Sequence, residues 1–231
     1  MQINSLHHQA KVIGKYNDII IDAKLETGEE ITAFCSALDI AKMCDVGSII
    51  YVRHLRKKSF HICYEVEFIE HQGTLVFVRP NANNDLFEEA FNAQMLPEFS
   101  DYAYCHRIIE TDHMPHIDFE LSNHNGEKCF VFVTNVYNKI GNSAVFPSEV
   151  NFFEIEMFEE MQKLRGEGYQ TCAFMIIPRS DCQNIRFSWK HSPQAAAQIY
   201  EAAKNGLKFI GYGCNIDKKS VTLSHIMPIL Y

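Results

Sequence analysis

The spacing of apolar residues changes near residue 80 and divides the chain into two kinds of sequence. Before this point, short apolar runs alternate with turn signals such as Thr27-Gly28, a pattern typical of a small β-barrel. After it, strand-like runs such as 129–137 alternate with helical spacing, as over residues 149–165. Such alternation predicts an α/β layer, because parallel strands need helical crossovers. We therefore predict an OB-like β-barrel domain over residues 1–84 and an α/β domain over residues 85–231.

Composition excludes several classes of protein. With 231 residues, 47% of them hydrophobic, each domain can bury a core without disulfides. The eight cysteines form no Cys-x-x-Cys pair, so we expect reduced thiols and a cytoplasmic protein. No apolar stretch approaches the ~20 residues of a membrane helix, so no membrane partner is expected. The net charge of −8 opposes general attraction to nucleic acid, so any such binding must come from a local basic patch.

One acid stands out in the second half. Residues 116–121 alternate polar and apolar and predict a strand that carries Asp118, and the run 129–135 predicts a buried neighbouring strand. Metal-dependent nucleases of the PD-(D/E)xK type carry an Asp on one such strand and Glu-x-Lys on the next. The second slot here reads Phe132-Val133-Thr134, so the layout suggests a nuclease scaffold without an intact nuclease site.

The two halves together resemble the sugar fermentation stimulation protein A family, which joins an OB-like barrel to a PD-(D/E)xK restriction-endonuclease-like domain. The resemblance covers residues 9–231 in collinear order. It is carried by Tyr16 to Phe34, Tyr64-Glu65, Asn84, Leu86, Glu89-Ala90, Ile117-Asp118-Phe119, Phe146-Pro147, Arg186-Phe187-Ser188, Ala203 and Gly206. It implies a protein that binds nucleic acid, DNA or RNA, through the fold of a metal-dependent nuclease.

The departures from the family concern its catalytic residues. An acid of the family falls on Arg107, the Asp after Phe-Pro becomes Ser148, and the Glu-x-Lys residues are lost, so only Asp118 remains. Phosphodiester hydrolysis with Mg²⁺ normally uses two or more carboxylates. We therefore predict a DNA-binding protein with a vestigial Asp118, an inactive nuclease site and no cofactor.

Three alternatives stay open. A rearranged nuclease would bind Mg²⁺ or Mn²⁺ between Asp118 and Glu149 from the following helix. The series His113-x-x-His116-x-Asp118 also has donors for a transition metal. A protein-interaction module that has lost nucleic-acid binding agrees best with the acidic net charge, and a homo-oligomer is compatible with each of these hypotheses.

The clearest binding signal is a basic and aromatic cluster in the barrel half. OB-type domains hold single strands with a positive groove and aromatic stacking platforms, so single-stranded DNA or RNA is an expected partner. A solvated hairpin tip would explain the same charges. The residues predicted to bind nucleic acid are Arg53, Arg56, Lys57, Lys58, Phe60, Tyr64 and Arg79.

Overall fold

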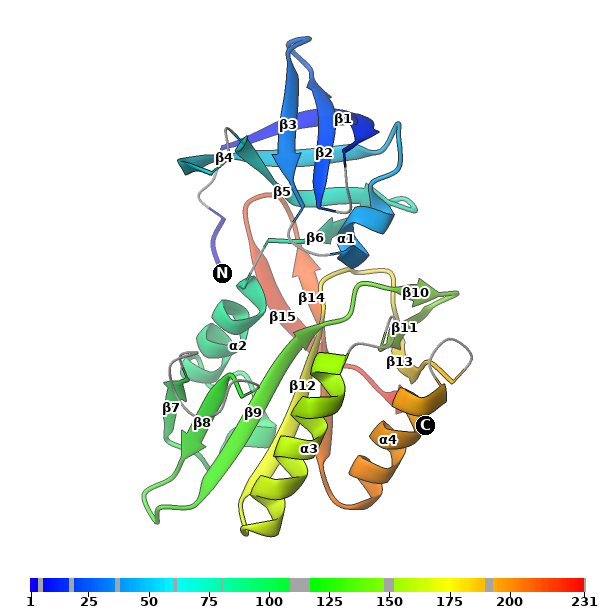
Figure 1. Ribbon diagram of the computed structural model, residues 1–231. Coiled ribbons are helices and arrows are strands. Elements are labelled where there is room, and N and C mark those ends of the chain that lie inside the picture. Colours follow the sequence, from blue (N-terminus) through cyan, green and yellow to red (C-terminus); the bar gives the residue numbers. More distant parts are fainter. Residues whose placement is uncertain are drawn as a thin grey trace. The chain divides into compact units, whose positions relative to one another are not determined.

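A computed structural model gives the fold of the chain as two compact units (Figure 1). It describes residues 1–3, 6–16, 19–35, 38–59, 62–79, 81–108, 117–147, 152–189 and 193–230. The barrel unit comprises Met1–Ala82, Pro178–Asp181 and Asn215–Thr222. The sheet unit comprises Asn83–Ile177, Cys182–Cys214 and Leu223–Tyr231. No helix among the described residues is long and apolar enough to cross a membrane.

The barrel unit is built around five strands that close on themselves. Strand β1 pairs with β2 and β4, β2 pairs with β3, and β4 pairs with β5. The parallel pairing of Ala33 and Phe34 with Tyr64 and Glu65 joins β3 to β5 and closes the barrel, which confirms the OB-like fold. The elements are β1 (His7–Lys15), β2 (Ile20–Leu25), β3 (Glu30–Phe34), α1 (Leu38–Met43), β4 (Ile49–Ser59), β5 (Ile62–His71) and β6 (Thr74–Phe77).

The sheet unit contains a six-stranded and a four-stranded sheet. The larger has the order β15-β14-β12-β9-β8-β7, and the smaller β10-β11-β13-β16. Its first elements are α2 (Ala82–Asn92), the 3-10 turn η1 (Pro97–Phe99), β7 (Tyr104–Arg107), β8 (Phe119–Ser122), β9 (Lys128–Asn135), β10 (Lys139–Ile140), β11 (Ser143–Phe146) and α3 (Phe152–Gly166). Then follow β12 (Gln170–Ile177), β13 (Asn184–Phe187), α4 (Pro193–Lys204), β14 (Lys208–Ile216), β15 (Val221–Ile226) and β16 (Ile229–Leu230).

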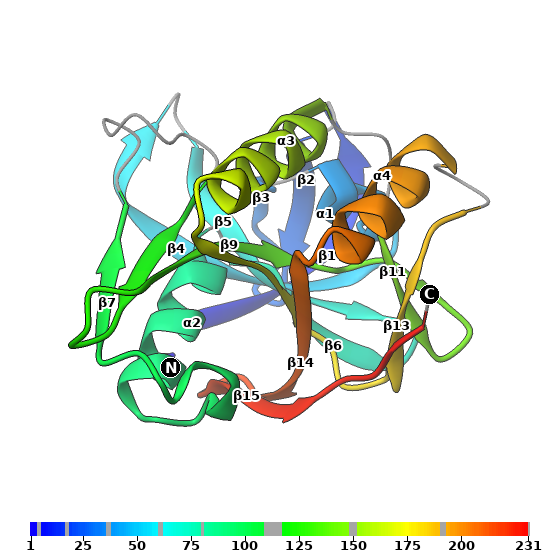
Figure 2. The same ribbon diagram turned by 90° about the horizontal axis from the view of Figure 1, so that it is seen from below.

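Helices cover both faces of the larger sheet, as the predicted α/β layer requires. Strand β12 lies parallel to β9 and β14 and is buried along almost its whole length, which explains its continuous apolar sequence. Helices α3 and α4 pack one face through residues such as Met161 and Ile199. Helix α2 packs the other through Phe87, which contacts Phe119 and Phe174 (Figure 2). The predicted α/β nuclease-like fold is therefore confirmed.

Some predicted boundaries were wrong. Helix α2 begins at Ala82, so it starts before the predicted boundary between residues 84 and 85, and Asp85 lies in its first turn. Asp118 was expected inside a strand, but β8 begins one residue later, at Phe119. The basic run was read as part of a barrel hairpin, and the antiparallel pairing of β4 with β5, up to Ser59 and Ile62, confirms this. Strand β4 continues to Ser59, so Arg53 to Lys58 belong to the strand and not to the turn.

Candidate functional site

Asp118 lies between two strands, just before β8. Its backbone N–H donates to the carbonyl of Val131 on β9 at 3.0 Å. Its backbone carbonyl accepts a hydrogen bond from the N–H of Ile108, which follows β7, at 2.9 Å. Backbone hydrogen bonds on both sides therefore fix the position of Asp118, and with it the direction of its Cα–Cβ bond.

The carboxylate of Asp118 accepts hydrogen bonds from two uncharged donors. Asn84 Nδ2 donates to Oδ1 at 2.8 Å, and the backbone N–H of Val133 donates to Oδ2 at 2.7 Å. Asn83 strengthens the arrangement, because its Nδ2 donates to the Val133 carbonyl at 2.9 Å. Hydrogen bonds therefore connect the first turn of α2, the Asp118 carboxylate and the middle of β9.

Burial decides how this carboxyl group titrates. Loss of water around the side chain raises the pKa of Asp118 above its ordinary value. The hydrogen bonds from Val133 and Asn84 and the positive charge of Arg107 lower the pKa but do not offset burial. Asp118 is therefore a partly desolvated acid without a cation bonded to its oxygens among the described residues.

Arg107 supplies a positive charge that acts on Asp118. It is the last residue of β7, and its Nη1 lies 2.9 Å from Asp85 Oδ1 and 3.8 Å from Glu88 Oε2. Both acids project from α2, one turn apart, toward the edge strand. The guanidinium thus bridges the helix that carries Asn84 and the strand beside Asp118.

The strand next to Asp118 offers no catalytic charge at the Glu-x-Lys slot. Phe132 is half-buried and packs against the core under α3 and α4, and Val133 is buried. Thr134 carries only a hydroxyl group, which cannot act as a cationic group. This slot therefore contributes apolar packing instead of a metal ligand and a lysine.

The described residues do not fit a divalent metal ion. Among them, no group of three or more His, Cys, Asp or Glu side chains could hold one. Glu149, His113 and His116 lie outside the described residues, so the sequence-based metal hypotheses that use them stay predictions. Glu120, two residues after Asp118, forms an ion pair with Lys128 at 2.9 Å.

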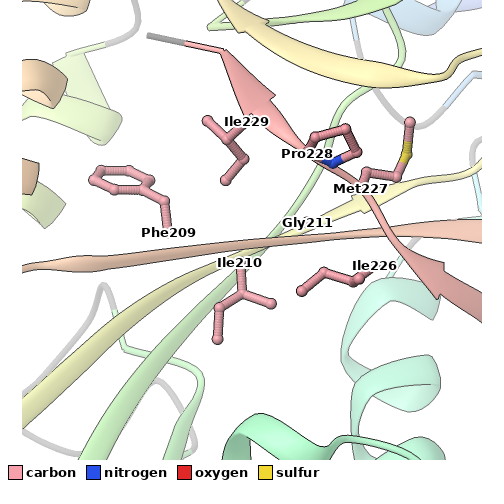
Figure 3. A pocket seen from close by; sticks show the side chains of 7 residues that line it. All are labelled: Phe209, Ile210, Gly211, Ile226, Met227, Pro228 and Ile229. Carbon is pink, nitrogen blue, oxygen red and sulfur yellow. The ribbon is translucent and has the colours of Figure 1, made fainter.

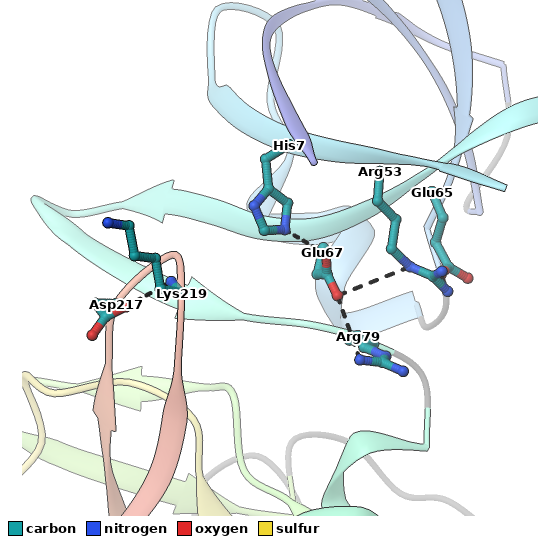
Figure 4. A network of polar contacts seen from close by, with 7 residues as sticks. All are labelled: His7, Arg53, Glu65, Glu67, Arg79, Asp217 and Lys219. Carbon is teal, nitrogen blue, oxygen red and sulfur yellow. Dashed lines mark hydrogen bonds and ion pairs between the residues drawn. The ribbon is translucent and has the colours of Figure 1, made fainter. Parts of the chain in front are cut away.

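A second charged cluster lies in the barrel unit (Figure 4). Glu67 on β5 is fully buried, and its Oε2 lies 2.5 Å from His7 Nε2. Its Oε1 lies 4.0 Å from Arg53 Nε and 3.8 Å from Arg79 Nη1. Arg53 also bonds to Glu65, its cross-strand partner. Two arginines predicted to bind nucleic acid therefore have carboxylate partners within the barrel.

Four more of the predicted binding residues, Tyr64 with Arg56, Lys57 and Lys58, lie where β4 ends and β5 begins. The Tyr64 ring contacts the ring of His54 edge-on, with centroids 5.2 Å apart, and lies 6.2 Å from that of His8. Arg56, Lys57 and Lys58 continue β4 beyond His54, but their side chains are outside what the structure describes. Phe60 lies outside the described residues altogether. The partly exposed rings are thus followed along β4 by three basic residues.

Several residues of these clusters were missed in the sequence. Asn83 and Glu88 gave no signal of their own, because their roles arise only when α2 packs beside β7 and β9. Glu67 had a weak signal, an acid within the apolar strand 62–69. His7 was unremarkable until β1 paired with β4 and brought it opposite Arg53.

An apolar cavity of about 420 Å³ lies elsewhere in the sheet unit (Figure 3). It is lined by Phe209, Ile210, Gly211, Ile226, Met227, Pro228 and Ile229. A Cβ atom on Gly211 would lie 2.1 Å from Ile185 Cδ1, so a larger residue here would require the Ile185 side chain to move. The lining carries no ionisable side chain, so it is not a candidate catalytic site.

Comparison with known proteins agrees with this architecture. The family model described as "Sugar fermentation stimulation protein RE domain" matches residues 81–220, more than half of the chain. The chain belongs to the sugar fermentation stimulation protein family. A sugar fermentation stimulation protein homolog of Geotalea daltonii is 24% identical over 222 residues, which cover 96% of each chain. One from Allorhizobium ampelinum is 26% identical and covers 95% of this chain and 94% of its own.

A solved structure of this family has the same fold. The structure of Pyrococcus furiosus SfsA in complex with Ca²⁺ covers all of both chains with a TM-score of 0.86. Its sequence identity to this chain is only 15%, so the likeness concerns the fold alone.

Proposed function

We propose that this member of the sugar fermentation stimulation protein family binds nucleic acid through its barrel unit and does not cleave it. The observation that carries the binding proposal is the ring cluster of Tyr64, His54 and His8, followed on β4 by Arg56, Lys57 and Lys58. Aromatic rings stack on bases, and basic side chains attract phosphates. Basic residues in series along β4, beside rings on β1, β4 and β5, suit an extended single strand of DNA or RNA.

The charge of the barrel limits how much its other arginines contribute. Arg53 and Arg79 have carboxylate partners in Glu65 and Glu67, so they add little net positive charge. On a chain with a net charge of −8, we expect binding to depend on the three residues at the end of β4.

The residues around Asp118 support the absence of cleavage. Hydrolysis by this class of site uses two or more carboxylates on a metal ion, together with a lysine that stabilises developing charge. Asp118 is held by neutral donors, Asp85 and Glu88 face Arg107, and the Glu-x-Lys slot carries Phe132 and Thr134. We therefore propose no resident Mg²⁺ or Mn²⁺ and an inactive site.

Binding is tested by fluorescence anisotropy on labelled oligonucleotides of about 16 nucleotides, single-stranded and duplex. The parent should bind the single strand, and a triple Arg56→Glu, Lys57→Glu, Lys58→Glu variant should lose this affinity. The slope of log affinity against log salt should fall by about 2, since three phosphate contacts at ~0.7 each are lost.

A control variant carries the same charge change elsewhere: Lys24→Glu, Lys163→Glu, Lys204→Glu, at three exposed lysines. It should weaken binding far less than the β4 variant. Equal losses in both would show that only total charge matters. A parent without measurable binding would favour the protein-interaction alternative.

Cleavage is tested on the same oligonucleotides with Mg²⁺, Mn²⁺ or Ca²⁺, followed on denaturing gels. The parent and Asp118→Ala should be equally inactive. Cleavage by the parent that Asp118→Ala abolishes would establish the alternative, a metal-dependent nuclease with a rearranged site.

A further inference from the structure

We infer that Arg107 is the resident cation of the nuclease-like site and takes the place of a divalent metal ion there. The inference rests on the proposed absence of cleavage, since it explains how acidic side chains can lie close together in this site without a metal ion. It concerns the charge that the site carries at rest, so it can be tested without nucleic acid.

The backbone brings Arg107 to the side of Asp118. Strand β7 pairs antiparallel with β8, and Arg107 lies directly opposite Phe119, the residue after Asp118. Ile108, the residue after Arg107, donates its N–H to the Asp118 carbonyl. The backbones of Arg107 and Asp118 are therefore diagonal neighbours, each one residue from the other's cross-strand partner.

The guanidinium satisfies acids that would otherwise repel one another. Nη1 lies 2.9 Å from Asp85 and 3.8 Å from Glu88, and the positive charge also acts on Asp118. Asp85 adjoins Asn84, whose amide donates to Asp118, so the acids of α2 and Asp118 belong to one continuous cluster. One fixed cation serves three carboxylates.

A divalent ion would compete poorly with this arrangement. Ca²⁺ needs six to eight oxygen ligands and Mg²⁺ six, whereas Asp85 already gives its Oδ1 to Arg107. Each Asp118 oxygen already accepts one hydrogen bond, from Asn84 or Val133. A metal ion near Arg107 would also meet a like charge that cannot leave or be deprotonated. The described donors do not supply the ligand set that the ion requires.

The experiment measures metal binding by the full-length protein, with Tb³⁺ luminescence and with calorimetric titration of Ca²⁺. The variants are Arg107→Glu, Asp118→Asn and the combination of both. We expect the parent to show no saturable site that depends on Asp118. Arg107→Glu replaces the cation with a fourth carboxylate and should bind Ca²⁺ at least about tenfold more tightly than the parent. Adding Asp118→Asn should remove that gain.

Arg186→Glu is the matched control, because Arg186 is exposed on β13 and undergoes the same charge change. Two results overturn the inference: Ca²⁺ binding by the parent that Asp118→Asn abolishes, or a gain in Arg107→Glu no larger than in Arg186→Glu. If Arg107→Glu does not fold, Arg107→Gln removes the charge without adding one and should show a smaller gain. Metal binding by the parent without cleavage would refute this inference alone and leave the proposed function standing.

Discussion

Two acids in this protein are held in opposite ways. Glu67 in the barrel unit is fully buried and faces three basic side chains, His7, Arg53 and Arg79. Asp118 in the sheet unit bonds to two neutral donors, Asn84 Nδ2 and Val133 N–H, and its cation, Arg107, is bonded to other acids. Glu67 is compensated by cations that face it directly, and Asp118 mainly by neutral hydrogen-bond donors, with a smaller effect of the Arg107 charge.

The two carboxylates differ in what their burial costs. A buried ion pair is expensive to break, because removal of one partner leaves the other charge unpaired. A carboxylate on neutral donors is still penalised by burial, and its raised pKa reflects that. Glu67 is thus paired with two arginines, whereas the carboxylate of Asp118 has no ion-pair partner among the described residues and keeps a raised pKa.

The largest expected effect is the loss of Glu67. Glu67→Ala should lower the free energy of unfolding by about 3–5 kcal/mol, because two guanidinium groups lose their buried partner. Urea denaturation measures the change. Glu29→Ala, at an exposed position of the same unit, should stay within about 0.5 kcal/mol. A loss below about 1 kcal/mol in Glu67→Ala would mean that the cluster rearranges at little cost.

The second effect concerns the amide that holds Asp118. Asn84→Asp keeps the size of the side chain, removes the Nδ2 donor and adds a carboxylate beside Asp118. We expect a loss of about 1.5–3 kcal/mol in unfolding free energy at neutral pH. Asn125→Asp, an isosteric change at an exposed turn, should be nearly neutral. Similar losses in both variants would contradict the assigned hydrogen bond.

The third effect should be smaller because its partners are exposed. Arg107 is 36% exposed, and Asp85 and Glu88 are 42% and 39% exposed, so water screens the pairs. Arg107→Ala should therefore cost about 1 kcal/mol or less in the same denaturation experiment. A loss as large as that of Glu67→Ala would mean that ion pairs contribute equally to the unfolding free energy in the two clusters.

The smallest effect is a pH dependence. Since the pKa of Asp118 is raised in the folded state, the folded protein binds more protons than the unfolded chain between the two pKa values. Its contribution to stability is present below the unfolded pKa and is lost as pH rises through the folded pKa. The unfolding free energy of the parent minus that of Asp118→Asn should therefore decrease from acid to neutral pH. An increase in this difference would mean that the pKa of Asp118 is lowered, and not raised, in the folded state.

The sequence predicted the barrel and the α/β layer because their signals are periodic. It did not predict edge strands such as β7 and β16, which have four and two residues and too few alternations to detect. The basic run was visible as a line of like charges, but the pairing of its first member, Arg53, with Glu65 depends on the register of β4 with β5. Asp118 was found from its motif. Its partner Asn84 was noted only as part of the resemblance, since the bond between them depends on where α2 packs.

The barrel unit is not contiguous in the chain, and this has a consequence for biosynthesis. Besides Met1–Ala82 it includes Pro178–Asp181 and Asn215–Thr222. Gln2 forms a bridge with Ser220, the Ile3 N–H donates to the Lys219 carbonyl, and Phe77 N–H donates to the Pro178 carbonyl. While the ribosome is still adding residues of α2 to α4, the emerging barrel lacks these partners. The first unit to leave the ribosome is thus among the last to be completed, after nearly all of the chain has been translated.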